Sequence, residues 1–115
     1  MKLNVFRENE FFIIQLIGEL DASSCIILDQ AIADAVKNNE KKILTDCAAL
    51  SYISSAGLGV FISYIEEFEN KNLSLVLYNL NQKVQKVFQI LGLDKLINIV
   101  HTKDEAKVRA NESQP

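Results

Sequence analysis

The apolar segment from Phe11 to Leu20 constrains the fold of this chain more than any other part of the sequence. In an extended strand it carries apolar side chains on both alternating faces, which are Phe12, Ile14 and Leu16 on one face and Phe11, Ile13 and Ile17 on the other. A strand of this kind is stable when both of its faces are covered by packing layers. We therefore expect a central strand in a sheet that is covered on both sides.

The remaining elements are expected from spacing, capping residues and turn residues. Residues 3–5 alternate with polar neighbours and are followed by a charged turn at 7–10, which predicts an opening hairpin. The expected helices are residues 24–38, 54–70, 81–92 and a polar helix from 102, and the later strands are 43–47, 73–80 and 97–100. Helices alternating with strands after a hairpin predict an α/β fold, a single-domain mixed β-sheet of about five strands packed with about four helices.

The length of the chain predicts the number of domains, and the spacing of apolar residues predicts which side chains of one helix are buried. A chain of 115 residues fits one domain, which we place at residues 1–111, with 112–115 as a frayed polar tail. In the helix at 54–70, the apolar stripe is predicted to contain Leu58, Phe61, Ile62 and Ile65. Val60 and Tyr64 lie off that stripe, where they are either partly exposed in a contact patch or, as is more common, packed under a neighbouring loop.

Composition excludes several classes of function. The formal net charge is −3 and the lysines are spread along the chain, which argues against direct nucleic-acid binding. Cys25 and Cys47 are too few and too far apart for a disulfide framework or a redox pair, and they lack neighbours for a metal site, so we interpret them as reduced core thiols. The sequence has no signal-peptide pattern and no apolar run of roughly 20 residues. We expect a soluble, cytoplasmic protein without cofactor, metal or membrane partner.

The segment from Asp46 to Gly59 combines a strand end, a loop and a helix start, where functional sites are common. Ser54 and Ser55 lie at the helix start, where free N–H groups and the helix dipole favour an anion by about 0.3–1 kcal/mol. A phosphate on Ser55 fits this position, and the small residues Ala56, Gly57 and Gly59 leave access for a partner. The alternative is that both serines only cap the helix.

Three motifs carry a resemblance to a known family. The stretch from Tyr52 to Phe61 resembles the signature of the STAS domain of bacterial anti-sigma factor antagonists. The segments 18–21, Gly-Glu-Leu-Asp, and 46–50, Asp-x-x-x-Leu, resemble the parts of that family that flank the signature. The resemblance covers nearly the whole chain and implies that Ser55 is the regulated serine.

The resemblance also implies partners and a switch. The unmodified protein would bind a serine-kinase anti-sigma factor and free a sigma factor, phosphorylation of Ser55 would end this binding, and a metal-dependent serine/threonine phosphatase would reset the switch. The implied partner interface contains Asp21, Asp46, Ser54, Ala56, Gly57 and Gly59. Phosphorylated family members usually carry Asp directly before the serine, whereas this chain has Ser54, which is an alternative acceptor.

Other interpretations remain open at this stage. A STAS scaffold that is never phosphorylated is one alternative, and an enzyme with Ser55 or a cysteine as nucleophile is another, although no acid or base partner has a defined spacing and His101 is expected on the surface. Asp21 and Asp46 are expected at strand ends, where they serve as loop caps, as interface residues beside Ser55, or as both.

Overall fold

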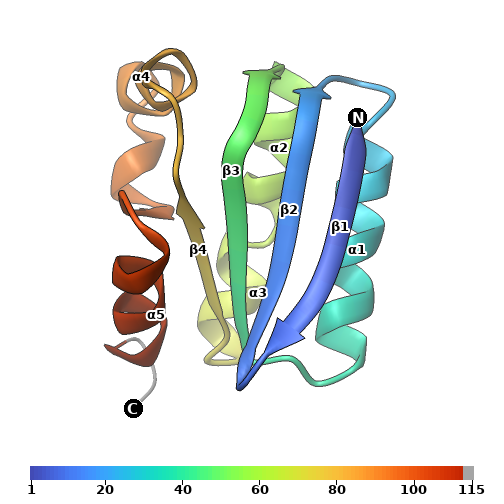
Figure 1. The fold of residues 1–115 in the computed structure, drawn as a ribbon, viewed down its shortest axis with the longest axis vertical. Coiled ribbons are helices and arrows are strands. Elements are labelled where there is room, and N and C mark those ends of the chain that lie inside the picture. The colour runs from blue at the N-terminus through green and yellow to red at the C-terminus, as the bar shows by residue number, and fades with distance from the viewer. Residues whose placement is uncertain (113–115) are drawn as a thin grey trace.

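The chain forms a five-stranded mixed sheet flanked by helices (Figure 1). A computed structural model describes residues 1–112, with these elements in chain order: β1 (Lys2–Glu8), β2 (Phe11–Leu20), α1 (Cys25–Lys37), β3 (Lys42–Ile53), α2 (Ser55–Ser63), α3 (Ile65–Asn70), β4 (Ser74–Tyr78), α4 (Gln82–Ile90), the 3-10 helix η1 (Leu93–Lys95), β5 (Asn98–Ile99) and α5 (Lys103–Glu112). Strand β1 is antiparallel to β2, and β2 through β5 are parallel in the order of the sequence. The predicted α/β class and mixed sheet are confirmed.

Both faces of β2 are covered, as its sequence predicts. On one face, Ile14, Leu16 and Leu20 pack into the larger core with residues of α1 and α2. On the other face, Phe11 and Ile13 belong to a smaller core that includes two alanines of α5. Helices α1, α2 and α3 lie together behind the sheet, and α5 lies at its β4 side (Figure 1).

Two further expectations concern the C-terminal tail and the presence of membrane-spanning helices. Helix α5 includes Glu112, which we expected in the polar tail, and residues 113–115 lie outside the described residues. No helix within residues 1–112 is long and apolar enough to span a membrane.

The predicted single helix at residues 54–70 is wrong, because the helix is divided at Tyr64 into α2 and α3. Val60 and Tyr64 are buried, in agreement with the second of the two predicted alternatives, whereas Ile62 is 43% exposed although we predicted it in the apolar stripe. The Tyr64 hydroxyl donates a hydrogen bond to Asp29 Oδ1 of α1 at 2.7 Å, so its polar end is satisfied inside the protein. This partner on a different helix explains why Tyr64 packs inward.

Strand β3 is longer than the predicted strand at 43–47. It stays paired with β2 until Ile53 lies opposite Leu20, with register shifts near Gln15 and Gly18. These irregularities interrupt the alternating pattern that would reveal a strand in the sequence. Because β2 and β3 are parallel and end together, the segments that follow them lie at the same edge of the sheet.

Gly57 lets α2 approach that edge closely. A Cβ atom at this position would lie 2.7 Å from Leu20 Cγ and 3.1 Å from Ile53 Cγ1. Gly57 is buried, so its predicted place in a partner interface is wrong, and its small size serves the packing of α2 on β2 and β3. Gly59 is exposed, and a Cβ atom there would meet no atom within 4 Å.

The two glycines therefore predict opposite effects of alanine. We expect Gly57→Ala to destabilise the protein by about 1–3 kcal/mol, because the added methyl group overpacks the contact with Leu20. The matched control Gly59→Ala should stabilise it by up to about 1 kcal/mol, because alanine favours the helix more than glycine does. Urea denaturation of both variants measures the change, and equal effects at the two positions would contradict this packing.

Candidate functional site

Ser54 and Ser55 have different environments at the start of α2. Ser54 is the N-cap residue, and its Oγ accepts a hydrogen bond from the Gly57 N–H at 3.2 Å. Its own N–H donates to the Leu20 carbonyl at 2.8 Å, which ties the helix start to the end of β2. Ser55 is the first residue of the helix and is exposed to solvent. Of these two hydroxyls, that of Ser55 is therefore the more accessible to a modifying enzyme.

The helix start can accommodate a negative group on Ser55. Ser54 provides acceptors for the N–H groups of Gly57 and Leu58. Within the described chain this leaves the N–H groups of Ser55 and Ala56 as the donors that α2 can offer to an anion. The first turn contains no acidic residue, so the helix dipole is not already neutralised by a side chain.

Asp21 lies directly after β2 and organises the turn that precedes α1. Its Oδ1 atom accepts hydrogen bonds from the N–H groups of Ser23 and Ser24 and from both of their hydroxyls, at 2.8 to 3.1 Å. These bonds, with the Ser24 N–H contributing most, lower the pKa of Asp21 to about 2. Asp21 is thus a loop cap at the same sheet edge as Ser54, and it carries a negative charge at neutral pH.

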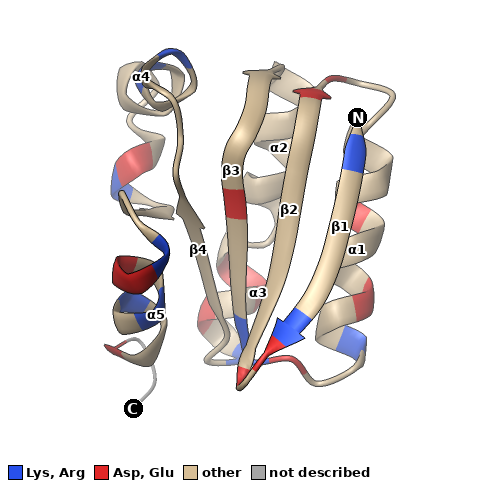
Figure 2. Ribbon diagram, viewed as in Figure 1, with Lys and Arg blue, Asp and Glu red and all other residues tan. Residues whose placement is uncertain are grey.

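Asp46 does not lie at that edge, contrary to the expectation that it ends its strand. It is within β3, seven residues before Ile53, which corresponds to roughly 20 Å along an extended strand. Figure 2 shows the acidic position of β3 well before the end of the strand. Its Oδ2 accepts a hydrogen bond from Gln15 Nε2 at 3.3 Å, and its Oδ1 accepts one from the Ala48 N–H at 3.0 Å. Asp46 therefore stabilises the irregular part of β3 and is not an interface residue beside Ser55.

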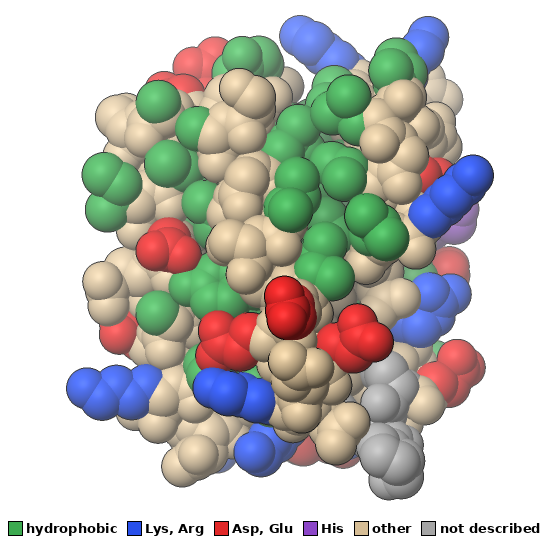
Figure 3. All heavy atoms as spheres, turned by 180° about the vertical axis from the view of Figure 1, so that it is seen from behind, with side chains coloured by type: hydrophobic (Ala, Val, Ile, Leu, Met, Phe, Trp, Pro, Cys, Tyr) green, Lys and Arg blue, Asp and Glu red, His purple; other side chains and the backbone are tan. Residues whose placement is uncertain are grey.

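The exposed face of α2 extends the site beyond the predicted residues. Ser55, Gly59 and Ile62 are exposed at positions i, i+4 and i+7, which share one face of a helix. Ala56 is partly exposed beside them. Apolar side chains are visible on the helical back face of the molecule, above a group of acidic side chains (Figure 3). Ile62 was missed as a surface residue, although its spacing of seven from Ser55 places it on the same helical face.

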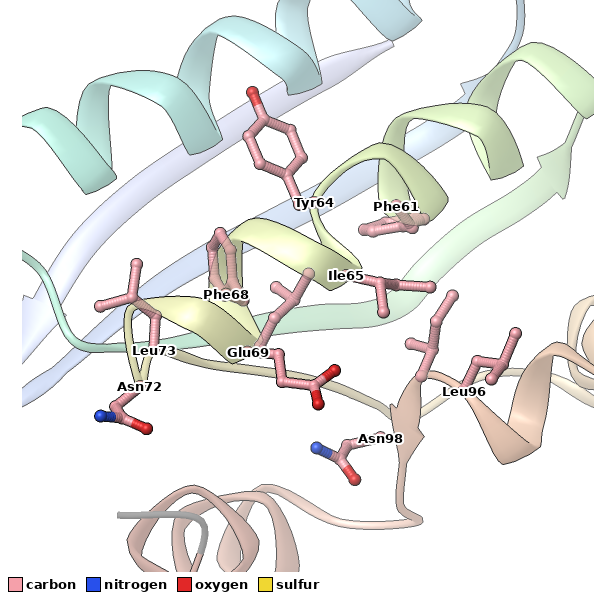
Figure 4. Close-up of a pocket in the computed structure, with 11 residues that line it drawn as sticks. Phe61, Tyr64, Ile65, Phe68, Glu69, Asn72, Leu73, Leu96 and Asn98 are labelled. Atoms are coloured by element: carbon pink, nitrogen blue, oxygen red, sulfur yellow. The ribbon is translucent and has the colours of Figure 1, made fainter. Parts of the chain in front are cut away.

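A groove of about 300 Å³ lies farther along the same helices (Figure 4). Phe61 and Ile65 line one side, and Leu96, which follows η1, lines the other. The side chains of Glu69 and Asn98 point toward one another across the groove in Figure 4. The lining residues are mainly apolar and include neither a serine, a cysteine nor a histidine, so the groove fits an apolar side chain better than it fits a catalytic reaction.

The cysteines differ from each other in accessibility. Cys47 is fully buried, and burial, together with the nearby charge of Asp46, raises the pKa of its thiol. Cys25 is partly exposed at the start of α1, and its Sγ lies 3.0 Å from the Ala22 carbonyl oxygen. Cys47 is therefore a core thiol as predicted, whereas Cys25 lies at the border of the core.

The turn at Asp21 predicts a defined response to pH. Because the folded pKa of Asp21 is below its ordinary value of 3.8, its ionised form stabilises the fold above about pH 4, and this stabilisation is lost as the pH falls toward 2. Ser23→Ala removes one hydroxyl donor and should raise the pKa of Asp21, as measured by NMR titration of its carboxyl carbon. The control Ser63→Ala, at the far end of α2, should leave that titration unchanged; an unchanged titration in Ser23→Ala as well would contradict the role of the turn.

Comparisons with known proteins agree with this geometry. The family model described as STAS domain matches residues 2–106. An anti-sigma-B factor antagonist of Listeria monocytogenes is 27% identical over 99 residues, covering 86% of this chain and 87% of that protein. The structure of an anti-sigma factor antagonist from Mycobacterium paratuberculosis superimposes with a TM-score of 0.87 at 21% identity, covering 96% of this chain and 93% of that one.

A second solved structure is that of the Bacillus cell fate determinant SpoIIAA in its phosphorylated form. It matches with a TM-score of 0.71 at 26% identity and covers 94% of this chain and 98% of its own. The solved structures thus share the overall fold of this chain. The chain belongs to the STAS domain family.

Proposed function

We propose that this protein is an anti-sigma factor antagonist controlled by phosphorylation of Ser55. The unphosphorylated form binds a serine-kinase anti-sigma factor and thereby releases a sigma factor. The kinase ends this interaction by phosphorylating Ser55, and a metal-dependent serine/threonine phosphatase removes the phosphate. The protein itself acts by binding and not as an enzyme.

The observation that supports this proposal most directly is the exposed hydroxyl of Ser55 on the first turn of α2. The neighbouring residues Ala56 and Gly59 are small and leave room for the approach of a kinase active site. The relatives in Listeria and Mycobacterium are named as antagonists of anti-sigma factors, and SpoIIAA is a relative whose phosphorylated form has been solved. These similarities support both the class of partner and the type of modification.

Ser55 is a better acceptor than Ser54 because the two hydroxyls have different structural roles. Ser54 Oγ is occupied as the cap of α2, and the residue is only partly exposed. A kinase that modified Ser54 would have to displace the cap, whose loss costs about 1 kcal/mol. Modification of Ser55 leaves the cap in place.

The effect of the phosphate follows from its charge. A phosphoserine adds a charge of about −1.5 to −2, which must be desolvated when a partner covers the start of α2. The ionised Asp21 at the same sheet edge adds like-charge repulsion. The free N–H groups at the helix start partly offset the charge within the protein itself. Phosphorylation therefore weakens the complex with the partner and leaves the folded domain intact.

A second candidate function is a STAS scaffold that binds its partners without being phosphorylated. The specific feature in its favour is Ser54, which replaces the acidic residue that is usual before the regulated serine in phosphorylated family members. The two functions differ in one measurable property, which is the incorporation of phosphate.

Phosphate incorporation is therefore the first test. After incubation with a serine-kinase anti-sigma factor and ATP, intact-mass measurement should show one phosphate on the wild type and on Ser54→Ala, and none on Ser55→Ala. Ser54→Ala should also lose about 1 kcal/mol of stability, because the cap of α2 is removed. Phosphate on Ser55→Ala would contradict the assigned acceptor, and no phosphate on the wild type would favour the scaffold.

A negative charge at position 55 should weaken binding to the partner without changing the stability of the fold. We expect Ser55→Asp to weaken binding to the anti-sigma factor at least tenfold, about 1.4 kcal/mol, with little change in melting temperature. Gln89→Glu adds the same charge to an exposed position of α4 and should bind like the wild type. Calorimetric titration and thermal melts measure both properties; a large shift in melting temperature with unchanged affinity would refute the proposed switch.

A further inference from the structure

Strand β1 leaves one long edge of the sheet open. It has seven residues, and throughout its length it pairs with β2 on one side, while no other described strand lies on its outer side. Its pairing with β2 has no register shift, and it contains no proline. The opposite edge differs, because β5 has only two residues and leads into α5. A long, regular and unpaired edge is a template for pairing with another strand.

Apolar side chains are exposed beside this edge. On β1, Val5 is 49% exposed and Phe6 is also exposed, and on the neighbouring α1, Ile26 is 70% exposed. A groove of about 690 Å³ runs between β1 and α1 and is lined by Leu3, Val5 and Ile26 among others. Figure 1 shows β1 and α1 together at the same side of the molecule. The open backbone edge is therefore continuous with an uncovered apolar surface, as expected of an interaction site.

The sequence of β1 indicates which partner strand fits. Val5 is the middle residue of the strand, and Lys2 and Glu8 lie three residues before and after it. If a second β1 is antiparallel to the first, with a two-fold axis at Val5, Lys2 of each copy lies opposite Glu8 of the other. Opposite charges in directly facing positions stabilise such a pair of strands. The strand is thus complementary in charge to a second copy of itself.

The existing contacts of Glu8 are compatible with this arrangement. Its carboxylate accepts hydrogen bonds from Lys103 at 2.7 Å and from Lys107. An ionised carboxylate offers about four acceptor positions, so a third lysine can be accommodated. Lys103 and Lys107 hold the Glu8 side chain in place and lower the pKa of its carboxyl group, and their charges reduce the attraction between Glu8 and Lys2 of a second copy.

We propose that two copies of this chain form a symmetric dimer by antiparallel pairing of β1 with β1. The two sheets join into one, Val5 faces Val5 across the two-fold axis, and the groove beside α1 of each copy is covered by the other copy. This is an isologous interface, in which the same surface of both molecules is used. Ser55 lies on α2 and not on β1, so the pairing of the two strands does not itself use Ser55.

The proposed dimer does not depend on phosphorylation or on an anti-sigma factor. Its consequence for the proposed function is that two switch sites belong to one particle. A partner with two linked binding sites would then bind with a higher effective concentration than it would to a single copy.

The experiment uses the full chain and the two-fold axis at Val5. Sedimentation velocity from micromolar to millimolar concentration should show the wild type passing from monomer to dimer. Val5→Lys and Val5→Glu should each lose the dimer, because like charges then face each other across the axis. An equimolar mixture of the two variants should restore it, because lysine then faces glutamate. Val5 is about half exposed, so both variants should keep the wild-type circular dichroism spectrum.

A matched control and a second variant make the outcome decisive. Ile90→Lys introduces the same charge at a residue of α4 that is 73% exposed, and it should dimerise like the wild type. Lys2→Glu should weaken the dimer by less than the Val5 variants do, because it faces Glu8 of the second copy, whose charge is already offset by Lys103 and Lys107. A monomeric wild type at all concentrations, a dimer that survives in Val5→Lys, or a mixture of the two variants that stays monomeric would each overturn the proposal.

Discussion

The contact between the end of β2 and the start of α2 fixes the geometry of the candidate site. The Ser54 N–H donates to the Leu20 carbonyl at 2.8 Å, and Gly57 packs on the Leu20 side chain. Both interactions require that β2 and β3 end at the same level, which is ensured by the pairing of Leu20 with Ile53. The position of the exposed Ser55 hydroxyl is therefore set by the hydrophobic core, and a charge added to this hydroxyl alters the surface while the contacts that position it remain.

In the proposed switch, Ser54 caps the helix and Ser55 accepts the phosphate, so the two roles belong to different residues. Aspartate and serine are both good N-cap residues, so Ser54 can start α2 as well as the acidic residue that is usual at this position. It does so without placing a further negative charge next to Ser55. A phosphate on Ser55 then meets less repulsion within its own protein, while the Asp21 carboxylate at the same edge remains charged. Ser54 therefore starts the helix without adding a charge to its first turn.

Local sequence signals predicted those features that local interactions determine. The apolar pattern of Phe11 to Leu20 identified the central strand, and a cap at Ser54 or Ser55 followed from their position before an apolar helix, although only the structure shows that Ser54 is the cap. The errors concern features that depend on distant partners. Asp46 was placed at a strand end because the pairing of β3 continues through an irregular region. The sequence left open whether Tyr64 is buried, because its hydroxyl finds its acceptor, Asp29, on another helix.

The exposed face of α2 and the open edge of β1 lie on different elements of the fold. Ser55, Gly59 and Ile62 lie on the outer face of α2, which follows β3 in the interior of the sheet order. Val5 lies on β1, an edge strand whose neighbour β2 is buried on both faces. The two surfaces are thus built from different elements, with β2 between the edge strand and β3. The proposed phosphorylation-dependent contact and the proposed strand pairing therefore use different elements of one small STAS domain.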